Sequence, residues 1–188
     1  MTAGCRTVID RSYLEDPAHQ RRWIRTAQFV QQSTMLSHGN PRRGLDLGDR
    51  TPLTDQLERI VGCPFDTTAV DLDIDSLTGN YGIVTAFEVL EHLFNPLHLL
   101  LQVRAVLSGA DARLFVSMPL NKPRCLASPD HFHEMRRNEA MLLFDRAGFS
   151  VLRSGLFRFR HPLFYCSGFK PLLRAWYEKI QIYELVCR

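Results

Sequence analysis

The sequence has little of the features that mark membrane, secreted and zinc-binding proteins. No apolar run approaches the roughly 20 residues of a membrane-spanning helix. Residues 1–10 contain no charged segment followed by an apolar one, as a secretion signal does. The five cysteines are scattered and none shows CxxC spacing, so neither a disulfide framework nor a zinc knuckle is expected. These features favour a cytoplasmic protein that does not enter the membrane.

Dense basic runs, internal repeats and low-complexity tracts are missing as well. The 23 Lys and Arg residues exceed the 20 Asp and Glu residues by a net charge of +3, which is too little by itself to predict nucleic-acid binding. With 188 residues, 45% of them hydrophobic, the chain has room for one ordinary globular domain. We expect this domain to span 1–188, with a helical segment over 1–40 and an α/β core over 43–188.

What the sequence does contain is an alternation of short apolar strands and helices. Apolar strands between helices indicate a mostly parallel sheet that is covered on both faces. This favours an α/β fold of the doubly wound, Rossmann-like type, in which the last two strands form an antiparallel edge. Strands are expected at 44–48, 67–74, 82–87, 114–118, 150–157 and 180–187, and helices at 17–36, from 51 onward, at 97–107, 134–147 and 170–178.

Three segments follow the ends of predicted strands, where doubly wound folds bind their ligands. These are 48–52, 71–75 and 87–92. The third continues as Phe-Glu-Val-Leu-Glu-His-Leu-Phe-Asn-Pro, and it is followed by Arg-Ala-Val-Leu-Ser-Gly, Leu-Phe-Val-Ser-Met-Pro, His-Phe-His and finally Leu-Leu-Phe-Asp-Arg-Ala-Gly-Phe. Taken together, over about 44–152, these motifs resemble the class I S-adenosylmethionine-dependent methyltransferases.

The resemblance implies S-adenosylmethionine as cofactor, and simple physical reasons agree with it. Gly48 allows a sharp turn where a ligand must approach, and the helix after it directs free N–H groups and its positive dipole end at the same spot. Asp71 or Asp73 is suited to hold the ribose hydroxyls, and Glu88 the cofactor ammonium group. The implied cofactor-binding residues are Asp46, Gly48, Asp49, Arg50, Asp71, Asp73, Phe87 and Glu88.

Two features depart from the family pattern. The usual G-x-G-x-G loop reads Gly-Asp-Arg-Thr-Pro here, so Arg50 either fills cofactor space or swings out to hold the cofactor carboxylate. In addition, only 40 positions separate Gly48 from Glu88, which indicates that one βα unit is abbreviated. Because of this, Asp71 is one match for the ribose-binding acid, while Asp73 or Asp75 could instead match an acid that contacts the adenine.

Three histidines are the candidates for the acceptor side of the site. In the family, His92 lies near the transferred methyl, and His131 and His133 follow the next strand. If the acceptor is a hydroxyl or an amine, His92 or His133 is the candidate base, since histidine titrates near neutral pH. The favoured reaction is therefore methyl transfer to an oxygen, nitrogen or carbon of a small molecule.

The remaining expectations concern partners and surfaces. Nucleic acid is not an expected partner. About half of the aromatic side chains in the C-terminal region should lie in the core, and the rest could contact a second copy of the chain or a protein partner. The pairs Arg21–Arg22 and Arg136–Arg137 are read as solvated helix faces. The aromatic C-terminal region contains Phe157, Phe159, Phe164, Tyr165, Phe169, Trp176 and Tyr177.

Two alternative functions stay open at this point. The altered glycine loop would also suit a catalytically silent methyltransferase fold that serves as a scaffold. The spacing of Glu88, Glu91 and His92, with His131 or His133, could hold a cation, and it resembles the small-RNA 2′-O-methyltransferases at this motif. We expect no metal, because the motif also occurs in metal-free relatives.

Overall fold

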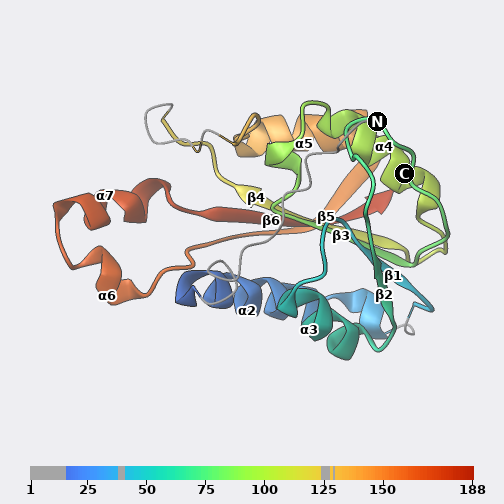
Figure 1. Cartoon of the computed structure of the whole chain (residues 1–188), viewed down its shortest axis with the longest axis horizontal. Helices are drawn as coiled ribbons and strands as arrows, with labels where there is room; N and C mark the ends of the chain where they lie inside the picture. The colour runs from blue at the N-terminus through green and yellow to red at the C-terminus, as the bar shows by residue number, and fades with distance from the viewer. Residues whose placement is uncertain (1–15, 38–40, 124–127, 129) are drawn as a thin grey trace.

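A six-stranded sheet lies between two layers of helices in the computed structural model, which describes residues 16–37, 41–123, 128 and 130–188 (Figure 1). The strand order is β2-β1-β3-β4-β6-β5. The strands β1 to β4 are parallel, whereas β6 is antiparallel to both β4 and β5. The predicted doubly wound fold with an antiparallel C-terminal edge is therefore confirmed. The strands are β1 (Gly44–Asp46), β2 (Phe65–Thr67), β3 (Ile83–Phe87), β4 (Arg113–Pro119), β5 (Phe149–Phe157) and β6 (Ile180–Cys187).

Each face of the sheet is covered by two helices (Figure 1). One layer contains α2 (Pro17–Gln31) and α3 (Pro52–Val61), and the other contains α4 (Pro96–Val106) and α5 (Arg137–Arg146). Three of the four begin with proline in the first turn, where its missing N–H costs nothing. The N-terminal helix is shorter than predicted, because it ends at Gln31 and a separate 3₁₀ turn, η1 (Thr34–Ser37), follows.

Two apolar clusters, one on each face, hold the layers together. The larger cluster joins α4 and α5 to the sheet through side chains such as Leu99 and Phe144, both fully buried. The smaller one joins α2 and α3 to the opposite face through Trp23, Leu57 and Phe115. Because both faces are covered, β4 is buried along its whole length and β3 up to Ala86, which explains why they read as continuous apolar runs.

The connection between β2 and β3 differs from the sequence prediction. A strand was expected over 67–74, but β2 ends at Thr67, and residues 68–82, all described, contain neither helix nor strand. The alternating acids form turns instead: the Asp71 carboxylate accepts from the N–H of Asp73 at 3.0 Å, and the Asp75 carboxylate accepts from the N–H of Asp71 at 2.8 Å. Such local bonds compete with a strand ladder, so the predicted strand is wrong.

A C-terminal arm extends beyond the sheet between β5 and β6 (Figure 1). It carries α6 (Pro162–Tyr165) and α7 (Phe169–Tyr177). The expectation that much of its aromatic content lies in the core is wrong: Tyr165 is buried, while Phe169 and Trp176 are 75% and 82% exposed. Of the seven aromatic residues of the region, only Tyr165 is buried, and Phe157, Phe159, Phe164 and Tyr177 are half-buried.

Two further features bear on the sequence predictions. In the described part of the chain, no helix combines the length and hydropathy needed to cross a bilayer. Cys63, Cys166 and Cys187 are free thiols. Cys5 and Cys125, like residues 1–15 of the predicted N-terminal segment, lie outside the described residues.

Truncating the core of α4 should destabilise the protein more than truncating its surface. Leu99 is fully buried between α4 and the sheet, so Leu99→Ala should lower the free energy of unfolding by about 2–5 kcal/mol. Leu101 lies on the same helix with 45% exposure, and Leu101→Ala should change it by about 0.5 kcal/mol or less. Urea unfolding of the two variants measures this; equal losses would show that α4 is not packed as described.

Candidate functional site

The candidate site lies at one edge of the sheet, where the parallel strands β1, β3 and β4 end. The turn at Gly48 follows β1, Glu88 follows β3, and the loop with His131 and His133 follows β4. Open α/β sheets bind ligands beyond these carboxyl ends. The topology therefore brings together three segments that lie far apart in the sequence.

The turn after β1 keeps open space beside its glycine. Gly48 has φ +111°, and no heavy atom lies within 4 Å of the position that a Cβ would take. Its N–H donates to Thr68 Oγ1 at 2.8 Å. Asp49 is exposed, and the Arg50 guanidinium donates to carboxylates of α3, 3.0 Å from Asp55 and 2.6 Å from Glu58. Arg50 is thus paired with α3 in this structure, and its role toward a cofactor stays a prediction.

Asp46, at the end of β1, is a buried carboxyl group with two hydroxyl partners. It is 7% exposed, and the hydroxyls of Thr54 and Thr85 each donate to one of its oxygens at 2.6 Å. Burial raises the pKa of Asp46 from its ordinary value of 3.8 to about 6, although both hydroxyls stabilise the charged form. Asp46 thus ties α3 and β3 to β1 directly beneath the Gly48 turn.

The two other acids predicted to touch cofactor occupy less defined positions. Asp71 is exposed, and since β2 ends at Thr67 it does not follow a strand end directly, as the sequence analysis assumed. Asp73 is half-buried and accepts from the N–H of Asn95 at 2.7 Å, which fixes the 68–82 connection to the start of α4. Their roles toward a cofactor stay predictions.

Glu88 is held in a strained backbone conformation at the tip of β3. Its φ is +56°, which is uncommon for a residue with a side chain and costs about 1–3 kcal/mol. Arg22 donates to one carboxylate oxygen and the Ser117 hydroxyl to the other, each at 2.9 Å. The preceding Phe87 is half-buried against the α2–α3 cluster. The surroundings therefore fix a carboxylate at the sheet edge.

Arg22 is a site residue that the sequence analysis missed. It was read as a solvated helix face, yet it is 8% exposed and reaches Glu88 from α2. The available signal was its spacing: Arg22 lies four residues before Thr26 and one before Trp23, on the buried face of the helix. Arg21, by contrast, is exposed, and so are Arg136 and Arg137, as predicted.

Two loops that follow neighbouring strands carry the histidine cluster, which consists of His92, His131 and His133. His92 ends a short 3₁₀ turn, η2 (Leu90–His92). The N–H groups of Phe132 and His133 both donate to the carbonyl of Glu91, at 2.7 and 3.2 Å. These bonds attach the loop after β4 to the turn after β3.

Each histidine has one ring nitrogen engaged with a neighbour. His92 Nδ1 donates to the carbonyl of Asp130 at 2.9 Å, and His133 Nε2 donates to the carbonyl of Phe94 at 3.3 Å. His131 Nδ1 lies 2.7 Å from Glu134. Because carbonyls and carboxylates can only accept, these partners assign the tautomers. The second nitrogen of each neutral ring keeps a lone pair for chemistry.

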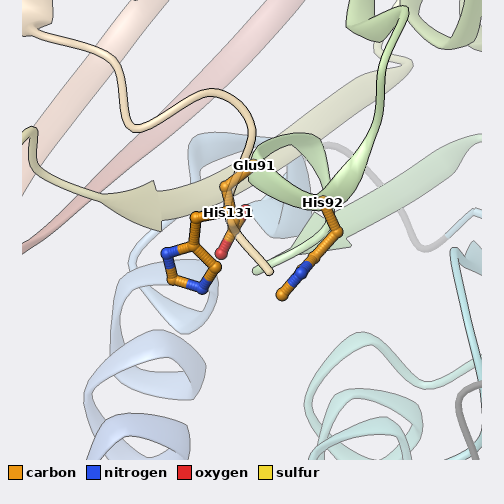
Figure 2. A group of neighbouring side chains, drawn as sticks. All are labelled: Glu91, His92 and His131. Carbon is orange, nitrogen blue, oxygen red and sulfur yellow. The ribbon is translucent and has the colours of Figure 1, made fainter. Parts of the chain in front are cut away.

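The cluster also places three potential metal ligands together. Ligand atoms of Glu91, His92 and His131 lie within 4.8 Å of one another (Figure 2). Glu88 and His133, the other residues of the motif-based set, have the hydrogen bonds described above and are not part of this group. The structure thus selects a smaller ligand set than the sequence offered.

Two surface hollows lie away from these residues. One, of about 60 Å³, is lined by Arg137 and residues of β5 and β6, and it is too small for a nucleoside. The other is a shallow depression of about 330 Å³ along α3, lined by Glu58, Arg59 and Cys63 among others. Neither includes a predicted cofactor or catalytic residue, so the chemistry of the sheet edge is the better guide to function.

Comparison with known proteins identifies the fold. Neither a scan of protein-family profiles nor a search of curated proteins found a match. A solved S-adenosylmethionine-dependent methyltransferase from Leishmania major, however, matches with a TM-score of 0.62 at 12% identity, over 92% of this chain and 74% of that one. The chain has the S-adenosylmethionine-dependent methyltransferase fold.

Two other solved structures show how widely this methyltransferase fold is used. Magnesium protoporphyrin IX methyltransferase from Synechocystis PCC 6803, with bound S-adenosylhomocysteine, matches with a TM-score of 0.53 at 15% identity over 91% of this chain and 84% of its own. A 4+2 cyclase, SpnF, matches with a TM-score of 0.58 at 14% identity over 86% and 79%. The reaction must therefore be argued from the site and not from the fold.

Asp46 should make stability depend on pH in the direction opposite to that of an acid whose pKa is lowered by folding. Its folded pKa of about 6 lies above its ordinary value, so the folded state holds the proton more tightly than the unfolded state between these values. The free energy of unfolding should fall by about 2 kcal/mol relative to Asp46→Asn as the pH rises from about 4 to about 7.

Urea unfolding of the wild type and Asp46→Asn at both pH values measures this difference. Asp49→Asn, which changes an exposed carboxyl group in the same turn, is the matched control. Parallel pH curves for the wild type and Asp46→Asn would contradict the buried position of this carboxyl group.

Proposed function

We propose that the protein is an S-adenosylmethionine-dependent methyltransferase that acts on a small-molecule acceptor. The observation that carries this proposal is the meeting of three features at one edge of a methyltransferase fold. They are the open turn at Gly48, the fixed carboxylate of Glu88 and the histidine cluster. A cofactor side and an acceptor side thus lie next to each other.

The residues present fit the cofactor on the β1 and β3 side. The open space beside Gly48 lets a ligand approach the backbone, as the close contact with a methionine moiety requires. Glu88 would bind the ammonium group: its two hydrogen bonds leave acceptor capacity, since a carboxylate offers about four lone-pair sites. Asp46 and the α3 N-terminus would support this side, and Asp71 or Asp73 would hold the ribose. The bound cofactor supplies an activated methyl group.

The histidine cluster would serve the acceptor. Burial lowers the pKa of His92, and the neighbouring His131 lowers it further, while the Asp130 carbonyl raises it. His92 is therefore neutral near pH 7, with its Nε2 lone pair ready to accept a proton. In His133 the hydrogen bond from Nε2 to the Phe94 carbonyl leaves Nδ1 facing away from this partner. Methyl transfer is an in-line displacement, so the main contribution of these residues is to place the nucleophile and remove its proton.

Binding of S-adenosylhomocysteine tests the cofactor side. The wild type should bind it with a Kd of about micromolar in calorimetry, and Glu88→Gln should weaken binding about tenfold or more, because a charged hydrogen-bond partner is lost. Asp111→Asn is the matched control, since Asp111 is exposed and precedes β4 at the opposite edge of the sheet. The absence of heat at millimolar nucleoside would favour the scaffold alternative and end the proposal.

Removal of the catalytic base should lower the turnover number kcat. With methyl-labelled S-adenosylmethionine and a panel of phenols, amines and carboxylic acids, His133→Ala or His92→Ala should lower kcat by about 10²–10⁴-fold on the responsive acceptor, with little change in cofactor Kd. His161→Ala, an exposed histidine on the C-terminal arm, should leave kcat unchanged. Unchanged turnover in both cluster variants would exclude histidine base catalysis.

A further inference from the structure

Glu91 is a buried carboxyl group without a hydrogen-bond partner. Its residue is fully buried, and both carboxylate oxygens lack a partner among the described residues. Burial and the nearby Glu88 carboxylate raise the pKa of Glu91 well above its usual range, and the charge of Arg22 offsets only part of this. Burying such a group is unfavourable unless it is protonated or meets a cation. A carboxylate in this position needs an explanation.

The imidazole rings of His92 and His131 lie close to Glu91, as ligands of one metal ion do. His92 and His131 stand edge to face, with ring centroids 4.8 Å apart, on either side of the Glu91 carboxylate (Figure 2). Both use Nδ1 for a hydrogen bond to an oxygen, from Asp130 in one case and Glu134 in the other. The lone pair is thereby left on Nε2 in both rings, so two Nε2 atoms and one carboxylate oxygen are available together.

The atoms behind His131 complete this pattern. Glu134 Oε1 accepts from His131 Nδ1 at 2.7 Å and lies 3.1 Å from Lys122 Nζ. A carboxylate on the far nitrogen fixes the ring and increases the basicity of the nitrogen that faces a metal. Lys122 points at Glu134, and Arg22 is bound to Glu88, so neither cation satisfies Glu91 by a hydrogen bond.

The geometry points to a divalent transition-metal site formed by Glu91, His92 and His131. Around a zinc-sized ion, ligand atoms lie about 3–3.5 Å apart, so the three ligand atoms, which lie within 4.8 Å of one another, would surround an ion after a small inward movement of the side chains. Two imidazoles with one carboxylate suit Zn²⁺, Co²⁺ or Mn²⁺ and not Mg²⁺ or Ca²⁺, which prefer oxygen ligands. Three protein ligands leave positions open for an acceptor oxygen.

The site has a consequence for the acceptor but does not depend on the proposed function. A cation here would polarise a bound acceptor oxygen and ease the loss of its proton. His92 would then be a ligand and could not also be the base, so proton removal would fall to His133. The sequence analysis expected no metal, and the unpartnered Glu91 together with the two oriented rings is what argues against that expectation.

Cobalt binding to the full chain tests the site without an activity assay. Chelator-treated protein without a histidine tag should bind one Co²⁺ per chain, with ligand-field absorption typical of nitrogen and oxygen ligands, and millimolar Mg²⁺ should not displace it. Bound metal should also raise Tm. Glu91→Gln and His92→Ala should weaken Co²⁺ binding about 100-fold or more, and Glu134→Gln about 10–100-fold.

His161→Ala is the control and should bind Co²⁺ like the wild type. His92 is exposed, so His92→Ala keeps the test decisive even if Glu91→Gln does not fold. Equal Co²⁺ affinity in the wild type and His92→Ala, or no saturable site, would overturn the inference. S-adenosylhomocysteine is titrated onto the same samples: metal binding without nucleoside binding would reject only the proposed function, and the reverse only the metal site.

Discussion

The carbonyl oxygen of Glu91 is the point on which the candidate site depends. It accepts the N–H groups of Phe132 and His133, and it thereby ties the loop after β4 to the turn after β3. Phe94 and Phe132, one from each loop, stack with ring centroids 4.1 Å apart and add a second contact between the two loops. Because these bonds join main-chain atoms, they hold whichever side chains the two loops carry. The positions of all three histidines follow from this one junction.

The backbone at the tip of β3 is also held by contacts from separate elements. Glu88 adopts a left-handed backbone conformation that the fold stabilises from two directions, with Arg22 from α2 and Ser117 from β4. A helix from the start of the described chain is thus connected to the centre of the sheet edge. Movement of α2 would remove the Arg22 contact and leave Glu88 held by Ser117 alone, so the position of α2 affects the charge at the site.

Much of the fold could be predicted from the sequence, because apolar periodicity and end signals dominate it. The range of β6 matches its prediction in full, and α7 differs by one residue at each end. The stretch after Thr67 could not be predicted, since Asp71 and Asp75 use their side chains to form turns in a segment whose composition reads as a strand. Local side-chain hydrogen bonds of this kind do not change the hydropathy pattern, so the pattern cannot predict them.

The residues of the histidine cluster could be named from the sequence, but their hydrogen-bond partners could not. His92, His131 and His133 were named from the sequence, and they do lie together around η2. Which ring nitrogen of each histidine carries the lone pair could not be predicted, because it depends on contacts in space: His92 meets the Asp130 carbonyl of the other loop, and His131 meets Glu134 within its own loop. Arg22 was missed for a similar reason: its partner lies 66 positions away in the sequence.

The two edge strands of the sheet, β2 and β5, affect whether the protein can pair with other molecules at high concentration. β2 is an edge strand of three residues, which leaves too few free backbone groups to recruit a strand from another molecule. β5, at the other edge, is nine residues long, but its pairing slips between Val151 and Arg153, and the interruption places a charged residue in the ladder. The short length of β2 thus protects one edge of the sheet from pairing with other molecules, and the irregularity in β5 protects the other edge.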